Sequence, residues 1–109
     1  MIKVENWKDI EKRPFHQNAE RQVFSGDNVM LVRNTIKPDF PQFRHSHPHE
    51  QLLCILEGRC MVMIGDESVE MGAGDMVRIS PNVEHDLKVI GDDTVINLDV
   101  FTPIREDYL

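Results

Sequence analysis

The stretch His45-Ser46-His47-Pro48-His49-Glu50-Gln51 holds three histidines and ends at an amide, just before the apolar run 52–56. His45 and His47 are two residues apart, so on an extended strand their side chains point to the same face. The next histidine is His85, far along the chain. Imidazole and amide donors that meet at one point suit a divalent transition metal. We therefore predict a metal site inside a β-barrel, with the ligands His45, His47, Gln51 and His85.

The chain around this stretch has the pattern of many short strands. Turn sequences such as Ser25-Gly26-Asp27-Asn28, Glu57-Gly58 and Gly65-Asp66 separate short apolar or alternating runs. No segment after residue 20 shows helical periodicity. Residues 1–20 are polar and irregular, with at most a short strand or helical turn. We predict an all-β sandwich or barrel, with strands over residues 22–24, 29–32, 43–47, 52–56, 60–64, 68–71, 76–79, 86–90 and 94–101.

Length and charge limit the function classes. A chain of 109 residues forms one domain, and its net charge of −7 argues against a nucleic-acid partner. The same charge means that an anionic ligand would need a local cation. No apolar run is long enough to span a membrane, and the start lacks the apolar core of a signal peptide. Cys54 and Cys60 lack a CxxC spacing, so we expect reduced thiols and a cytoplasmic protein.

The motif spacings resemble those of the cupin superfamily, whose members fold as a double-stranded β-helix, or jelly-roll β-barrel. The resemblance covers residues 40–90 directly, and the strand pattern extends it to residues 21–101. It implies a single cupin barrel over residues 21–109, preceded by an N-terminal segment over residues 1–20. The residues that match the two cupin motifs are, in chain order, His45, His47, Gln51, Gly58, Gly74, Pro81 and His85.

Several positions depart from these motifs. Pro38-Asp39 stands at the leading glycine of the first motif, and Val89 stands at the final asparagine of the second. Asn82 replaces a turn glycine, and asparagine tolerates a positive φ better than most residues. Gln51 replaces an acidic ligand, so the predicted site has no anionic ligand and a bound metal keeps its full charge. That favours a Lewis-acid role over oxygen chemistry at a carboxylate-supported iron.

The C-terminal residues 99–109 are similar to the ending of the small pectin-degradation cupins of the KdgF type. That family converts 4,5-unsaturated uronates, released from pectin or alginate, into the linear keto form. It also carries three histidines and one glutamine at its metal. The resemblance implies the same reaction here, with Asp99, Phe101 and Arg105 lining the pocket beside the metal. Small cupins often pair through sheet edges, so it further implies a homodimer, for which residues 1–20 are available.

The implied roles follow simple chemistry, and each has an alternative. Asp99 would shuttle a proton, or it is hydrogen-bonded with Asn97 at the barrel mouth. Phe101 would wall off the sugar ring, or it belongs to the core. Arg105 would bind the substrate carboxylate with its planar fork, or it forms a surface salt bridge with Glu106, Asp107 or another chain.

The metal ligands have alternatives too. Gln51 could be a core amide bonded to backbone, and His49 or Glu50 could take a ligand position instead. The donor set does not choose among zinc, nickel, manganese, iron, cobalt and copper. Two other functions fit the same residues: a metal-dependent dioxygenase or lyase that acts on another small acid, and a barrel that binds a sugar or small molecule without catalysis.

Overall fold

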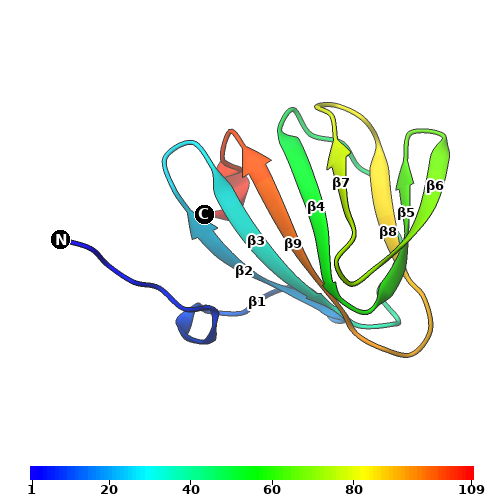
Figure 1. Cartoon of the computed structure of the whole chain (residues 1–109), viewed down its shortest axis with the longest axis horizontal. Coiled ribbons are helices and arrows are strands. Elements are labelled where there is room, and N and C mark those ends of the chain that lie inside the picture. Colours follow the sequence, from blue (N-terminus) through cyan, green and yellow to red (C-terminus); the bar gives the residue numbers. More distant parts are fainter.

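The strands form two antiparallel sheets, which confirms the all-β prediction (Figure 1). The computed structural model describes all residues from Met1 to Leu109. One sheet has the order β1-β2-β3-β9-β4-β7 and the other the order β6-β5-β8. The strands are β1 Arg13–His16, β2 Ala19–Ser25, β3 Met30–Ile36, β4 Glu50–Glu57, β5 Arg59–Ile64, β6 Glu67–Gly72, β7 Met76–Ile79, β8 His85–Val89 and β9 Val95–Thr102, and the 3-10 helices are η1 Trp7–Asp9 and η2 Glu106–Tyr108.

The main hydrophobic core lies between the inner faces of the two sheets. It joins Leu53 and Ile55 of β4 to Cys60 and Val62 of β5 and to other buried residues. On β9 every second residue is buried, so one face of this strand points inward. The inward residues of β9 are Val95, Asn97, Asp99 and Phe101. The strand therefore places two polar side chains in the interior of the barrel, between apolar ones.

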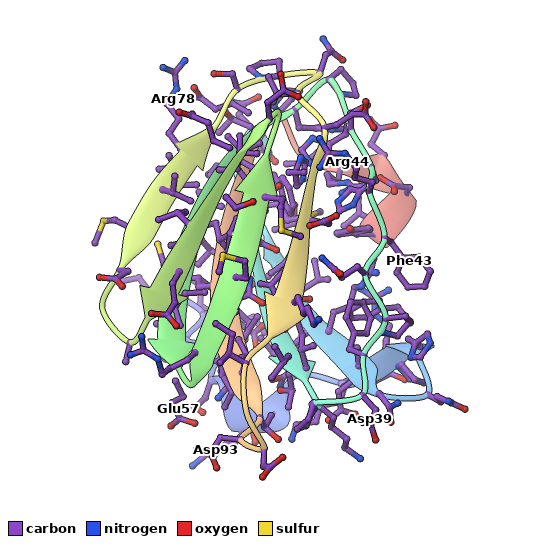
Figure 2. All side chains as sticks on the ribbon, turned by 90° about the vertical axis from the view of Figure 1, so that its right-hand side faces the viewer. Asp39, Phe43, Arg44, Glu57, Arg78 and Asp93 are labelled. Atoms are coloured by element: carbon purple, nitrogen blue, oxygen red, sulfur yellow. The ribbon has the colours of Figure 1, made fainter.

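One sequence prediction needs correction. The predicted strand 43–47 is wrong as a regular strand, because only His45 forms a bridge there, with His85. Prolines at positions 41 and 48 lack a backbone donor, and the segment runs along one side of the barrel with Phe43 pointing outward (Figure 2). Residues 1–20 contain the short helix η1 and the short strand β1, as expected, and β2 starts at Ala19. The first residues extend away from the sheets (Figure 1).

Both cysteines are free. Burial raises the pKa of the Cys60 thiol to about 11, and the nearby carboxylate of Asp75 acts in the same direction.

Neither short helix has the length or hydropathy needed to cross a bilayer.

Gly58, in the turn between β4 and β5, is a position where a side chain cannot fit. Its φ is +87°, and an added Cβ would lie 2.7 Å from the Thr94 carbonyl oxygen and 3.0 Å from Val95 Cα. Because both contacts are with backbone, the chain itself would have to move. We expect Gly58→Ala to lower the free energy of unfolding by about 3 kcal/mol, measured by urea denaturation.

Gly74 provides the matched control. Its φ is +92°, but an added Cβ would meet nothing within 4 Å. Gly74→Ala therefore carries the backbone strain without the collision, and its expected cost is about 1 kcal/mol. Equal losses for the two variants would show that the contact with Thr94 and Val95 does not matter.

Candidate metal centre

The three predicted histidines meet because two distant segments pair through their backbones. The N–H of His45 donates to the His85 carbonyl at 3.1 Å, and the N–H of His85 donates to the His45 carbonyl at 2.9 Å. The N–H of Asn82 donates to the His47 carbonyl at 2.8 Å. Asn82 has a φ of 65°, which confirms that it takes the place of the turn glycine. One ring nitrogen from each of the three histidines lies within 4.8 Å of the others.

Backbone carbonyls orient all three rings in the same way. The Nδ1 of His45 donates to the Phe43 carbonyl at 2.9 Å, and that of His85 donates to the Val83 carbonyl at 2.8 Å. The Nδ1 of His47 donates to the His49 carbonyl at 3.0 Å. A carbonyl oxygen only accepts, so the proton of each neutral ring is on Nδ1 and the lone pair is on Nε2. Such second contacts typically fix the tautomer of a metal-binding histidine.

Two atoms that each carry a free lone pair, the amide oxygen of Gln51 and the Nε2 of His47, face each other in this cluster. The amide Nε2 of Gln51 donates to Asp99 Oδ1 at 2.7 Å, which turns its Oε1 toward the histidines. That Oε1 lies 3.0 Å from the Nε2 of His47, and the Nε2 of His85 is buried without a hydrogen-bond partner. Acceptors placed in this way repel each other unless a cation lies between them. Three imidazole nitrogens and an amide oxygen fit a divalent transition metal.

Burial favours the neutral form of the two inner rings, which is the form that binds a metal. It lowers the pKa of His85 to about 4, and the charges of His45, His47 and Arg105 act in the same direction. Burial also lowers the pKa of His47, with a further contribution from Arg105, against the raising effect of the Gln51 oxygen, which would accept a hydrogen bond from the protonated ring. His45 lies at the exposed edge of the cluster.

The alternative ligands lie outside the cluster. The ring of His49 is 5.5 Å from the ring of His47, centroid to centroid, and it does not join the three converging nitrogens. Glu50 accepts a hydrogen bond from Arg78 Nε at 2.8 Å, on an exposed part of the surface. Gln51 is therefore the residue of this stretch whose oxygen faces the histidines, and its role as a metal ligand stays a prediction.

Asp99 is held by three side-chain amides. Its Oδ1 accepts from Gln51 and, at 3.0 Å, from Asn97, and its Oδ2 accepts from Asn34 at 2.8 Å. Burial raises the pKa of Asp99 to about 6, although the three amides and the charge of Arg105 oppose this. The hydrogen bond between Asp99 and Asn97, which is the alternative to a proton-transfer role, is therefore present. Asp99 also accepts a hydrogen bond from Gln51. Asp99 fixes the direction in which the Gln51 amide points.

A cavity of about 260 Å³ opens beside these residues. Phe101 is buried, and its ring meets the ring of His47 edge to face at 5.4 Å, so it serves both as core and as wall. Arg105 lies over the rings of Phe101 and Tyr108 at 5.2 and 4.1 Å, and its Nη2 is 3.0 Å from Asp107. The predicted site residues that line the cavity are His45, Gln51, His85, Asp99, Phe101 and Arg105.

Sequence reasoning missed other residues of this cavity. Arg21 of β2 and Tyr108 of η2 both line it, and Asn34 completes the amide set around Asp99. No motif marks these positions. Their place depends on the pairing of β2 with β3 and on the path of the chain after β9, which local sequence patterns do not reveal.

Comparisons with known proteins agree with this architecture. The sequence matches the cupin domain family over residues 32–101. No curated protein matches it. An RmlC-like cupin from Shewanella frigidimarina NCIMB 400 superposes with a TM-score of 0.90 at 24% identity, covering 100% of this chain and 97% of the other. KdgF from Halomonas sp. gives a TM-score of 0.85 at 19% identity, with 94% and 95% covered.

A third solved structure also shares this fold. A predicted oxalate decarboxylase from Thermotoga maritima has a TM-score of 0.82 at 16% identity, covering 94% of this chain and 100% of that one. Identities this low support a shared fold. The family match covers most of the chain and includes the histidine stretch and His85. The protein belongs to the cupin family, and its two sheets form the jelly-roll barrel of that family.

Proposed function

We propose that this cupin is a metal-dependent enzyme that opens and ketonises 4,5-unsaturated uronates, giving the linear keto acid. One observation carries the proposal. Two of the three converging histidines line one cavity with a buried carboxylate, an aromatic ring and a guanidinium, and the third, His47, contacts that ring. These cavity-lining residues are His45, His85, Asp99, Phe101 and Arg105. Proton transfer, ring binding and carboxylate binding are what an acidic cyclic substrate of this kind needs.

Each side chain has a role that fits its position. His45, His47, His85 and Gln51 would hold a divalent metal, which stabilises negative charge on substrate oxygens when bound. Asp99 moves a proton between substrate atoms during ring opening and ketonisation. Arg105 binds the substrate carboxylate, which replaces Asp107 as its ion-pair partner. The Asp107 side chain is 58% exposed, so its ion pair with Arg105 is weak. Phe101 covers one face of the sugar ring and excludes water.

The resemblance to KdgF-type cupins supports the substrate class. The C-terminal residues that carry it are the ones that meet the histidines in the cavity, through the contact of Phe101 with His47 and the stacking of Arg105 on Phe101. The fold likeness to KdgF from Halomonas sp. agrees with the proposal.

The test is the loss of the enol-ether absorbance of an unsaturated galacturonate after addition of metal-loaded protein. We expect the absorbance to fall faster than in the spontaneous reaction, without oxygen consumption. An unchanged rate with several divalent metals would refute the proposal. Oxygen uptake with a small acid would favour the dioxygenase instead.

Removing the positive charge of Arg105 should weaken this reaction. Arg105→Met keeps the stem that packs on Phe101 and Tyr108 but loses the fork, so we expect kcat/KM to fall by about tenfold to a hundredfold. Most of the change should be in KM, because the carboxylate does not react. Arg59→Met is the control, since Arg59 lies exposed on β5 and pairs with Glu70. Equal kinetics for the two variants would exclude Arg105 as a substrate ligand.

A further inference from the structure

A second guanidinium lines the cavity, between two aromatic rings. The Cζ of Arg21 lies 4.2 Å from the ring centroid of Phe15 and 3.8 Å from that of Tyr108. These three residues come from β2, β1 and η2, so both ends of the chain meet around Arg21. Figure 1 shows the C-terminal turn beside β2 and β3. Stacking between rings holds the plane of the guanidinium in place and leaves its N–H edge available.

Arg21 has no polar partner in the structure. Its Nε is buried without a hydrogen bond, and no carboxylate lies within ion-pair distance of its side chain. Arg105, on the same Tyr108 ring, is paired with Asp107. Arg21 is therefore the arginine of this cavity that has no ion-pair partner.

Other cations surround Arg21. Arg13 is its cross-strand partner on β1, and the Nη2 of Arg13 donates to the Tyr108 carbonyl at 2.6 Å. Burial lowers the pKa of Arg21, and the charges of Arg105 and Arg13 act in the same direction, while Tyr108 and Asp107 oppose them. Like charges on facing strand positions are destabilising. In a chain with a net charge of −7, two arginines that line one cavity, with Arg13 opposite one of them, indicate an anionic ligand rather than general surface charge.

Arg105 lies nearer to the histidines than Arg21 does. Arg105 lies over the ring of Phe101, which contacts the ring of His47, whereas Arg21 lies over the rings of Tyr108 and Phe15. The order along the cavity is therefore the histidine cluster, then Arg105 with Phe101, then Tyr108 and Arg21. Arg21 is thus the next cation along the cavity after Arg105.

We propose that Arg21 is a specificity-determining residue, which binds the carboxylate of an acidic sugar together with Arg105 and selects acids over neutral sugars. This takes the ligand class from the proposed function and adds a residue outside the family motifs. The rings of Phe15 and Tyr108 hold the guanidinium in position for the ligand. The guanidinium N–H groups of Arg21 provide the hydrogen bonds, and Arg105, which lies over the same Tyr108 ring, adds charge.

Binding of two probes that differ in one group tests this directly. Calorimetry would compare galacturonate with galactose, which has a hydroxymethyl group in place of the carboxylate. We expect wild type to prefer galacturonate, and Arg21→Met to lose about tenfold or more of its affinity for galacturonate with little change for galactose. Arg21→Lys keeps the charge but not the fork, so it should recover part of the preference. Arg59→Met should behave as wild type.

The results separate this inference from the proposed function, because the binding assay needs no turnover. If the acid preference depends on Arg21 but unsaturated uronate is not converted, the inference stands and the enzymatic proposal fails. If wild type does not distinguish the two sugars, or Arg21→Met keeps the full preference while remaining folded, the inference is overturned. A purely structural role of Arg21 would lower the melting temperature without changing the ratio of the two affinities.

Discussion

Replacing His85 with alanine is expected to reduce bound divalent metal from about one per chain to nearly none. His85 is buried, its Nδ1 is fixed by the Val83 carbonyl, and its Nε2 has no other partner. The variant loses one of three imidazole ligands, and the remaining set includes His45 at the exposed edge. Elemental analysis of protein dialysed against a divalent metal and then desalted would measure the loss. Turnover of the unsaturated uronate should disappear with it.

His49→Ala is the matched control for this experiment. His49 is a neighbouring histidine whose ring lies outside the converging cluster, and alanine keeps the carbonyl that orients His47. We expect it to retain its metal. Loss of metal in both variants, or in neither, would contradict the ligand set.

Replacing Asp99 with asparagine should have the second largest effect. Asp99 accepts hydrogen bonds from the amides of Gln51, Asn97 and Asn34, and asparagine offers one oxygen in place of two. Its amide would then oppose at least one of the three donors. The Gln51 oxygen would no longer be held toward His47, so we expect metal affinity to fall by about 10- to 100-fold. Loss of the proton-transferring carboxylate should lower kcat by about 100-fold or more.

The two effects can be separated and controlled. At saturating metal, the weaker metal binding of the variant no longer affects the measured rate. A kcat that recovers fully under this condition would show that Asp99 only positions Gln51. Asp86→Asn is the control, because Asp86 is a second buried aspartate that lines the cavity, with a single long contact to Gln42 at 3.5 Å. It should leave metal affinity nearly unchanged. An equal loss in both variants would indicate a general effect of charge.

The sequence was sufficient for the fold and for the convergence of three histidines. Strand alternation and turn residues predicted most of the strands, and the motif spacing brought His45 and His47 to His85. The strand and turn predictions succeeded because register and turn chemistry are local. The convergence of His85 with His45 and His47 joins distant segments, and it was predicted from the histidine spacing and the match to the cupin motifs. The replacement of a turn glycine by Asn82 followed the same local rule, and its φ of 65° confirms it.

The residues around the histidines were harder to predict. The segment that carries His45 pairs only at isolated points, because the nearby prolines remove donors and it runs along the side of the barrel. The link from Gln51 through Asp99 to Asn34 joins three strands, and Arg21 depends on contacts with Phe15 and Tyr108 from both ends of the chain. Such contacts depend on tertiary packing, and one sequence carries no local pattern for them.

Anomalous diffraction from a crystal of the metal-loaded protein tests the central claim most directly. The account predicts one strong peak per chain, about 2.0–2.2 Å from the Nε2 atoms of the three histidines, with the Gln51 oxygen completing the set. A peak bound through Nδ1, a peak at His49 or Glu50, or no peak between His45, His47 and His85 would contradict it.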